Sequence, residues 1–245
     1  MTTKQKILNG KIIPGDRVFY PVKSHIRGSV PKSEKNNLDG KNVFIDHRLS
    51  GELGKHPPPD DEKRIDGIRT MINEMGCDPA GEHGNKRDDL FIHFTYDVPN
   101  FSKLTELSRS EWDKLVDQFI NTPAKFTRDV LDELVPNGSD DPRKFKDAKG
   151  RIIIIGPALP AGKKISGHER AKVEVFRGAL RPFATTINQE LSDVLKSNIR
   201  VFLILPGTVD GKEPNNENIV NTINYLMSDE SQSSSEVIFC PDETR

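Results

Sequence analysis

The sequence predicts an α/β fold built on a doubly wound parallel sheet. Short apolar runs, typical of buried strands, alternate along the chain with longer stretches in which apolar residues recur at helical spacing. The run at 151–156 is apolar almost throughout, as expected for a central parallel strand that is covered on both faces. Because strands that alternate with helices require right-handed crossover connections, we expect helices on both sides of the sheet.

The pattern gives each element in order. The prolines at 57–59 exclude a helix there, so Asp60 or Asp61 is expected to cap the first helix and Gly76 to end it. The second helix is expected to begin at Ser110, because apolar residues then recur at intervals of three and four. The predicted strands are 42–45, 90–94, 151–156, 201–205 and 236–240, and the predicted helices are 60–75, 110–134, 167–195 and 219–227.

Length and composition limit the class of protein. A chain of 245 residues fits one domain, with 36 Lys and Arg against 37 Asp and Glu, so no charge excess favours nucleic acid or an anionic membrane as partner. The N-terminal stretch contains no signal peptide or membrane span, and Cys77 and Cys240 give no disulfide framework. We therefore expect a cytoplasmic protein, with both cysteines as small buried hydrophobic residues.

The first 40 residues differ in composition from the rest. They are basic and are interrupted by Pro14, Pro21 and Pro31, which suits an irregular arm that lies on a surface. The sequence thus predicts an N-terminal arm over residues 1–40 and one domain over 41–245.

Five segments, in this order, resemble those of the short-chain dehydrogenase/reductase family over roughly residues 38–240. They are Ser108-Arg109-Ser110-Glu111-Trp112-Asp113, Gly150-Arg151-Ile152-Ile153, Ala171-Lys172 with Phe176, Leu180 and Glu190-Leu191, Asn198-Ile199-Arg200-Val201 with Leu205-Pro206-Gly207-Thr208, and Tyr225-Leu226-Met227-Ser228-Asp229. The resemblance implies a Rossmann-like sheet and an NAD-dependent oxidoreductase scaffold.

The loop after the first strand departs from a dinucleotide-binding turn. Such a turn needs closely spaced glycines before a helix N-terminus, where backbone N–H groups meet the pyrophosphate. Here the loop carries Arg48, Gly51, Glu52 and Gly54, so it has two glycines and a carboxylate, and prolines follow. We interpret it as a plain loop that binds no cofactor.

The length of the next region supports the same interpretation. Only 35 residues, 55–89, lie between Gly54 and Leu90. A βαβ unit takes roughly 30 residues or more, so a complete fold of this kind needs on the order of 60 residues here. We expect one strand–helix unit, and the adenosine pocket with it, to be missing.

The catalytic positions implied by the resemblance are also altered. The family uses a Tyr acid/base, a Lys four residues later, a Ser and an Asn around a bound nicotinamide. In this sequence the Tyr position falls on His168 and Lys172 is retained. The Ser position falls on Gly156-Pro157, and the Asn position falls on Phe119. The bulky run at 93–96 would fill the cofactor groove. We therefore expect no catalytic residue, no cofactor bound by this chain and no enzyme by itself.

Two alternatives remain open at this stage. His168 and Lys172 stand one turn apart on a helix, so His168 could serve as a general base without a cofactor, although a neighbouring ammonium disfavours its protonated form. The chain could instead be a free-standing binding or scaffold protein. The six histidines show no ligand spacing, so no metal site is expected.

The helices at 110–134 and 167–195 keep their apolar periodicity. In the family these helices usually pair with their counterparts in a neighbouring subunit; the simpler alternative is that they only cover the sheet. We expect interface residues at Trp112, Leu115, Phe119, Phe176, Leu180 and Phe183. The resemblance implies a non-catalytic subunit that pairs with a catalytically active short-chain dehydrogenase subunit, which holds NAD and acts on a hydroxyacyl-CoA.

Overall fold

The computed structural model of the chain describes residues 35–46, 59–79, 90–95, 98, 103–135, 145–146, 148–159, 167–207, 216–228, 231 and 237–240. No helix in these ranges is long and apolar enough to cross a membrane.

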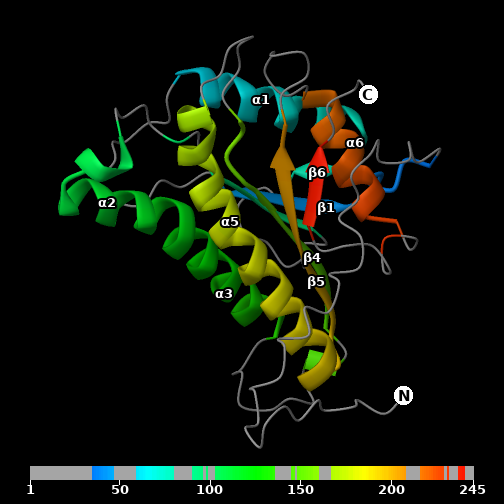
Figure 1. Cartoon of the computed structure of the whole chain (residues 1–245). Coiled ribbons are helices and arrows are strands. Elements are labelled where there is room, and N and C mark those ends of the chain that lie inside the picture. The colour runs from blue at the N-terminus through cyan, green and yellow to red at the C-terminus, as the bar shows by residue number, and fades with distance from the viewer. Residues whose placement is uncertain are drawn as a thin grey trace, which may run out of the picture.

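The described strands form one parallel six-stranded sheet in the order β2-β1-β3-β4-β5-β6 (Figure 1). The strands are β1 (Asn42–Asp46), β2 (Asp78–Pro79), β3 (Leu90–Phe94), β4 (Lys149–Ile155), β5 (Asn198–Pro206) and β6 (Val237–Cys240). The central strands are buried along most of their length, because isoleucine, leucine and phenylalanine fill both faces. The predicted α/β doubly wound fold is confirmed.

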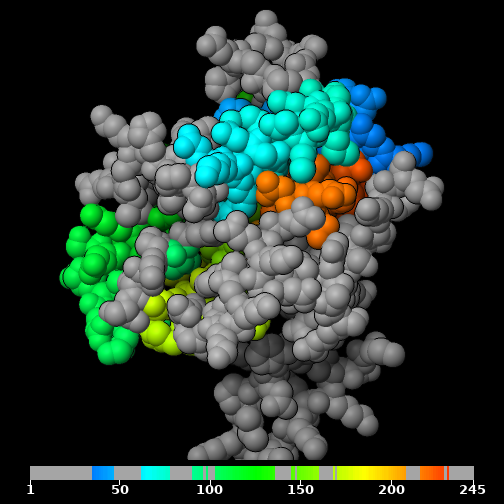
Figure 2. All heavy atoms as spheres, turned by 90° about the horizontal axis from the view of Figure 1, so that it is seen from above, coloured from blue at the N-terminus to red at the C-terminus, as the bar shows by residue number. Residues whose placement is uncertain are grey.

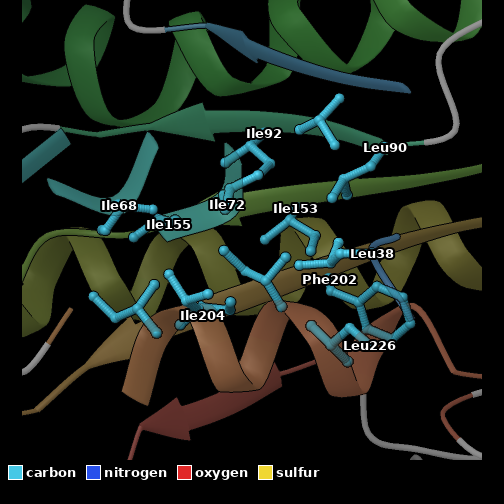
Figure 3. Close-up of a cluster of buried hydrophobic side chains, with 14 of the residues drawn as sticks. Leu38, Ile68, Ile72, Leu90, Ile92, Ile153, Ile155, Phe202, Ile204 and Leu226 are labelled. Atoms are coloured by element: carbon cyan, nitrogen blue, oxygen red, sulfur yellow. The ribbon is translucent and has the colours of Figure 1, made fainter. Parts of the chain in front are cut away.

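Helices cover both faces of this sheet. The helices α1 (Pro59–Glu74) and α6 (Asn216–Leu226) lie side by side over one face, as seen from above in Figure 2. The cluster beneath them joins helix residues such as Ile68 and Leu226 to strand residues such as Ile92, Ile153 and Ile204 (Figure 3). At full burial each of these side chains stabilises the fold by roughly 1.5–3 kcal/mol.

The other face is covered by α3 (Thr122–Leu134) and α5 (Gly167–Gln189). Apolar residues of β3, β4 and β5 that point away from α1 pack here, including Phe91, Ile154 and Leu203. The helix α2 (Arg109–Val116) leads into α3 through a π-helical turn, η2 (Asp117–Asn121), and a second such turn, η3 (Glu190–Val194), continues α5. A short 3-10 helix, η1 (Leu104–Glu106), precedes α2.

Two helix boundaries and one strand differ from the sequence-based expectation. The second helix is capped by Ser108 rather than Ser110, because the Ser108 hydroxyl accepts from the Glu111 backbone while the Glu111 carboxylate accepts from the Ser108 backbone. The first helix begins at Pro59, which needs no backbone N–H at this position. The strand β2 was not predicted, since Asp78 and Pro79 have no apolar pattern.

The last residues of the expected N-terminal arm pack into the domain. Leu38 is fully buried in the cluster under α1 and α6. The side chain of Asn224 in α6 accepts from the backbone of Asn37 at 2.7 Å and donates to the carbonyl of Lys35 at 3.0 Å. Residues 1–34 lie outside the described ranges.

Candidate site at the carboxyl edge of the sheet

In an open α/β sheet, ligands bind at the carboxyl edge, at the point where successive connections leave in opposite directions. Here β1 leads outward to β2 on one side, whereas β3 leads to β4 on the other. The crevice expected to receive a ligand therefore lies between the ends of β1 and β3.

Asp46 and His93 meet at this position. They are register partners on β1 and β3, and Nδ1 of His93 lies 3.3 Å from Oδ2 of Asp46. Both side chains are buried, with 1% and 4% exposed, and the imidazole stacks on Phe126 of α3 at a centroid distance of 5.0 Å. The carboxylate can therefore fix the orientation of the ring.

Of the bulky residues at 93–96 that were expected to fill a cofactor groove, His93 and Phe94 lie in strand β3 on opposite faces, and Tyr96 lies outside the described ranges. The strand β3 extends to Phe94, so consecutive side chains alternate between its faces. His93 faces α3, and Phe94 belongs to the cluster under α1 and α6. Thr95 follows the strand, and its hydroxyl donates to the carbonyl of Ile155 at 2.9 Å.

The end of β4 presents no side-chain hydroxyl. Gly156 donates its N–H to the carbonyl of Ile204 at 2.8 Å, and a Cβ there would lie 2.7 Å from a methyl group of Leu205. Pro157 and Ala158 are buried after it. A Ser at this edge is thus replaced by a tightly packed apolar turn.

The two residues that could form a base and its partner have different environments. Lys172 is buried, whereas His168, one turn earlier on α5, is exposed. The two residues therefore differ in their access to solvent, although they stand one turn apart on the same helix.

Phe119, at the position where the family carries an Asn, is fully buried. It packs on Phe176 of α5 at a ring-centroid distance of 4.8 Å, and Trp112 contacts the same ring at 6.0 Å. The apolar periodicity that assigned Phe119 to the core is therefore confirmed.

The residues expected at a subunit interface fall into two groups. Four of them are buried within this chain and so lie beneath its surface: Leu115, Phe119, Phe176 and Leu180. Trp112 is 39% exposed. Phe183 is half-buried. These last two are the members that a partner could contact directly.

Arg177 is a buried residue that the sequence pattern did not single out. Only 2% of its side chain is exposed. Its Nη1 donates to the carbonyl of Pro206 at 2.9 Å and its Nη2 to that of Leu205 at 3.5 Å, while Nε lies 3.9 Å from a carboxylate oxygen of Glu174. The guanidinium thus holds the carboxyl end of β5. Arg177 lies between Phe176 and Leu180 in the apolar stripe of α5, and that position was the sequence signal that could have indicated its burial.

The remaining site predictions fall partly outside the described ranges. Arg48, Gly51, Glu52 and Gly54 lie there, so the loop after β1 stays a prediction. Within the described ranges no cluster of three or more possible metal ligands occurs.

The thiol of Cys77 donates to the carbonyl of Leu38. Burial of the thiol and, to a smaller extent, the negative charge of Asp39 raise the pKa of Cys77 to about 11. Cys77 is therefore a buried hydrophobic residue, as expected.

Comparison with known proteins gives a structural likeness without a sequence match. No protein-family model and no curated protein sequence matches the chain. An NADH-dependent reductase responsible for alginate metabolism, A1-R', is similar with a TM-score of 0.56 at 15% identity, over 85% of this chain and 98% of that one.

Two further similar structures come from named bacteria. The enoyl-[acyl-carrier-protein] reductase (NADH) of Aquifex aeolicus VF5 has a TM-score of 0.54 at 16% identity, over 84% of this chain and 97% of its own. An oxidoreductase of the short-chain dehydrogenase/reductase family from Burkholderia thailandensis has a TM-score of 0.51 at 14% identity, over 83% and 91%.

A nicotinamide cofactor is implied by this fold, and the described residues fit it only in part. Lys172 is retained and buried on α5, but the turn after β4 offers no side-chain hydroxyl, and the loop after β1 lies outside the described ranges.

The prediction that the chain is no enzyme by itself is contradicted. It rested on altered residues, some of them outside the described ranges, whereas the similar structures are NADH- or NADPH-binding oxidoreductases and the fold is enzyme-like. At these identities the likeness establishes the fold alone. The chain therefore has the fold of a short-chain dehydrogenase/reductase oxidoreductase.

Proposed function

We propose that the chain is a subunit of a hetero-oligomeric oxidoreductase of the short-chain dehydrogenase/reductase type. Its partner is an intact short-chain dehydrogenase subunit that holds NAD, and the two associate through α5 and the adjoining part of α2. A hydroxyacyl-CoA is the proposed substrate class.

The observation that carries this proposal is the uncharged outer face of α5. Residues spaced by one or two turns along this face are exposed or half-exposed, and none carries a charge: Ala171, Val175, Gly178, Pro182, Thr186 and Gln189. In a chain of which 30% is charged, a solvated helix face of this length would be expected to carry several charges. An uncharged exposed face instead suits contact with another protein.

Exposed apolar side chains gather on the same layer of the molecule. Among the described residues, the large hydrophobic side chains that are exposed are Trp112, Val175 and Val194, which belong to α2, α5 and η3. Trp112 contacts Phe176 of α5, the residue that follows Val175 in the sequence, at a ring-centroid distance of 6.0 Å. Tryptophan at the centre of a contact is a frequent source of binding energy.

The same face is shaped for close approach of a helix. A Cβ added at Gly178 would meet no atom within 4 Å, so this point of α5 leaves room for a partner side chain. Beside it, Arg181 and Glu174 form an ion pair at 3.0 Å. Such a polar rim around an apolar centre is the usual composition of an interface.

The substrate class rests on the resemblance and on one similar structure. The Aquifex enzyme is named for a substrate carried on acyl carrier protein. A hydroxyacyl-CoA such as 2-[hydroxy(phenyl)methyl]succinyl-CoA, from anaerobic toluene degradation, is the acyl substrate that we propose for the assembly.

Co-expression with an intact short-chain dehydrogenase encoded by a neighbouring gene tests the association. We expect a stable complex by size exclusion with light scattering, and we expect Val175→Glu and Trp112→Glu to reduce its affinity by at least tenfold. Asn73→Glu on α1, at an exposed site on the opposite face, is the matched control and should leave the complex intact.

Two outcomes would replace the proposal. A homo-oligomer that ignores the dehydrogenase would favour a scaffold. Tight binding of NADH by the isolated chain, measured by fluorescence, or turnover that depends on His168 would show that the chain works without a partner.

A further inference from the structure

Arg177 connects the outer helix layer with the carboxyl end of the sheet. It lies on α5, and only 2% of its side chain is exposed. Its Nη1 donates to the carbonyl of Pro206 at 2.9 Å, and its Nη2 donates to the carbonyl of Leu205 at 3.5 Å. Because the guanidinium is a rigid planar group, these two bonds restrict the movement of the backbone at the end of β5.

The bond to Pro206 lies where the pairing between β4 and β5 comes to its end. Gly156 donates its N–H to the carbonyl of Ile204 at 2.8 Å. The next residue, Pro157, has no N–H to donate, and Pro206 has none either. The carbonyl of Pro206 is on the same side of β5 as that of Ile204, two residues earlier, and it accepts from Arg177. A helix side chain thus supplies a donor where two prolines weaken the strand pairing.

Glu174 joins this buried guanidinium to the surface of α5. Its Oε1 lies 3.9 Å from Nε of Arg177, and its Oε2 accepts from Nη2 of Arg181 at 3.0 Å. The side chain of Glu174 is 32% exposed. One carboxylate therefore faces both the solvent and the cation that holds the end of β5.

The outer face of α5 gives a partner access to this carboxylate. Glu174, Gly178 and Arg181 are spaced by four and three residues, so they share one face of the helix. A Cβ added at Gly178 would meet no atom within 4 Å, so a partner side chain can enter beside the ion pair. Such a side chain would displace water from Glu174. Because the attraction between charges grows as the local dielectric constant falls, the carboxylate would then hold Arg177 more firmly.

We propose that Glu174 and Arg177 transmit association on α5 to the carboxyl end of β5. A partner that covers Glu174 reduces the mobility of the strand end and of the turn into Gly207. Ligands of open α/β sheets bind at the carboxyl edge, so association prepares that edge for a ligand. The link itself rests on contacts within this chain, whereas its control by a partner rests on the proposed function.

Hydrogen exchange of the backbone amides in the isolated full chain tests the link. Glu174→Gln keeps the size of the side chain and removes its charge. We expect the amides of Leu205 and Gly207 to exchange about twofold to fivefold faster in this variant, the range for a partly exposed ion pair. Glu190→Gln, the same change at an exposed site further along the helix, is the matched control and should exchange as wild type does. The amide of Ile92 in β3 reports on global unfolding and should not change.

The same amides, measured in the complex with the co-expressed dehydrogenase, test control by the partner. At concentrations where light scattering shows full association, exchange at Leu205 and Gly207 should slow about fivefold or more in the wild type, the range for coupled sites. In Glu174→Gln the complex should still form through Val175 and Trp112, and this slowing should be lost.

Each part of the proposal has its own contrary result. Wild-type exchange in isolated Glu174→Gln would overturn the link, and so would faster exchange that includes Ile92 to the same extent, since that would show a general loss of stability. Slowing that persists in the Glu174→Gln complex would overturn control through Glu174. If no complex forms, the proposed function and control by the partner both fail, and the isolated chain alone decides whether the link exists.

Discussion

The carboxamide of Asn188 in α5 pairs with both backbone groups of Val201 in β5. Its Nδ2 donates to the Val201 carbonyl at 2.5 Å, and its Oδ1 accepts from the Val201 N–H at 2.9 Å. Among the described residues, β6 pairs with β5 only from Leu203 onward, so no described strand residue pairs with this edge of Val201. A helix side chain makes the two hydrogen bonds there instead.

Replacing Asn188 should be among the most destabilising single changes. Asn188→Ala leaves a buried N–H and a buried carbonyl unsatisfied, which costs about 1–3 kcal/mol for each group. We expect the free energy of unfolding in urea to fall by roughly 2–5 kcal/mol. Thr186→Ala, an exposed change on the same helix, should alter it by less than about 0.5 kcal/mol.

Arg177 and Arg181 make a matched pair for a second stability measurement. Both lie on α5 near Glu174, but Arg177 is buried against the end of β5 and Arg181 is partly exposed. Arg177→Met should lower the free energy of unfolding by about 1–3 kcal/mol, because the carbonyls of Leu205 and Pro206 lose their donor. Arg181→Met should cost no more than about 1 kcal/mol. Equal losses would show that the carbonyl contacts contribute little.

The capping box of α2 predicts a dependence on acid. Hydrogen bonds from the Ser108 side chain and backbone lower the pKa of Glu111 below the ordinary glutamate value of 4.5. A lowered pKa in the folded state stabilises the fold above the ordinary value, and this contribution is lost as pH falls through the folded pKa.

Ser108→Ala should therefore raise the pKa of Glu111 towards 4.5, measured by carboxyl NMR titration. It should also lower the stability at neutral pH by about 1 kcal/mol, the usual effect of losing an N-cap. Ser110→Ala, inside the same first turn, should leave the Glu111 pKa unchanged; a shift there would contradict the assignment of Ser108 as the cap.

Cys77 predicts a dependence on alkali. Its pKa of about 11 in the folded protein exceeds the ordinary thiol value of 9.0, so the native state favours the protonated thiol. That preference is fully present below pH 9 and is lost as pH rises towards 11.

In a Cys240→Ser background, the Cys77 thiol should react with iodoacetamide at pH 8 far more slowly than in urea, because the thiolate is the reactive form. Stability should fall between pH 9 and 11, and Cys77→Ala should remove that part of the slope. Rapid native-state labelling would contradict the assignment.

The sequence predicted the arrangement of strands and helices because apolar periodicity reports burial directly. The strand run 151–156 and the helix 167–195 correspond closely to β4 and to α5 with η3. The pattern could not reveal β2, because its two residues, Asp78 and Pro79, form no apolar run in the sequence, although they pair with β1.

Polar residues with buried roles were harder to find. Arg177 carries a side chain that usually faces water, so its burial against the end of β5 could be suspected only from its place in the apolar stripe of α5. The buried position of Phe119 was predicted, because an aromatic residue within the apolar stripe of a helix is usually buried in the core. Lys172 was identified only through family resemblance, although it stands four residues before Phe176 in the buried stripe of α5.

The contact between Asn37 and Asn224 links residues that are 187 positions apart. During synthesis, the segment before β1 leaves the ribosome long before α6 exists to receive it. Leu38 therefore stays without its final neighbours on α6 until nearly the whole chain has been made. Truncation at the C-terminus would thus loosen the opposite end of the sequence, and a nascent chain would depend on chaperones to shield that apolar segment.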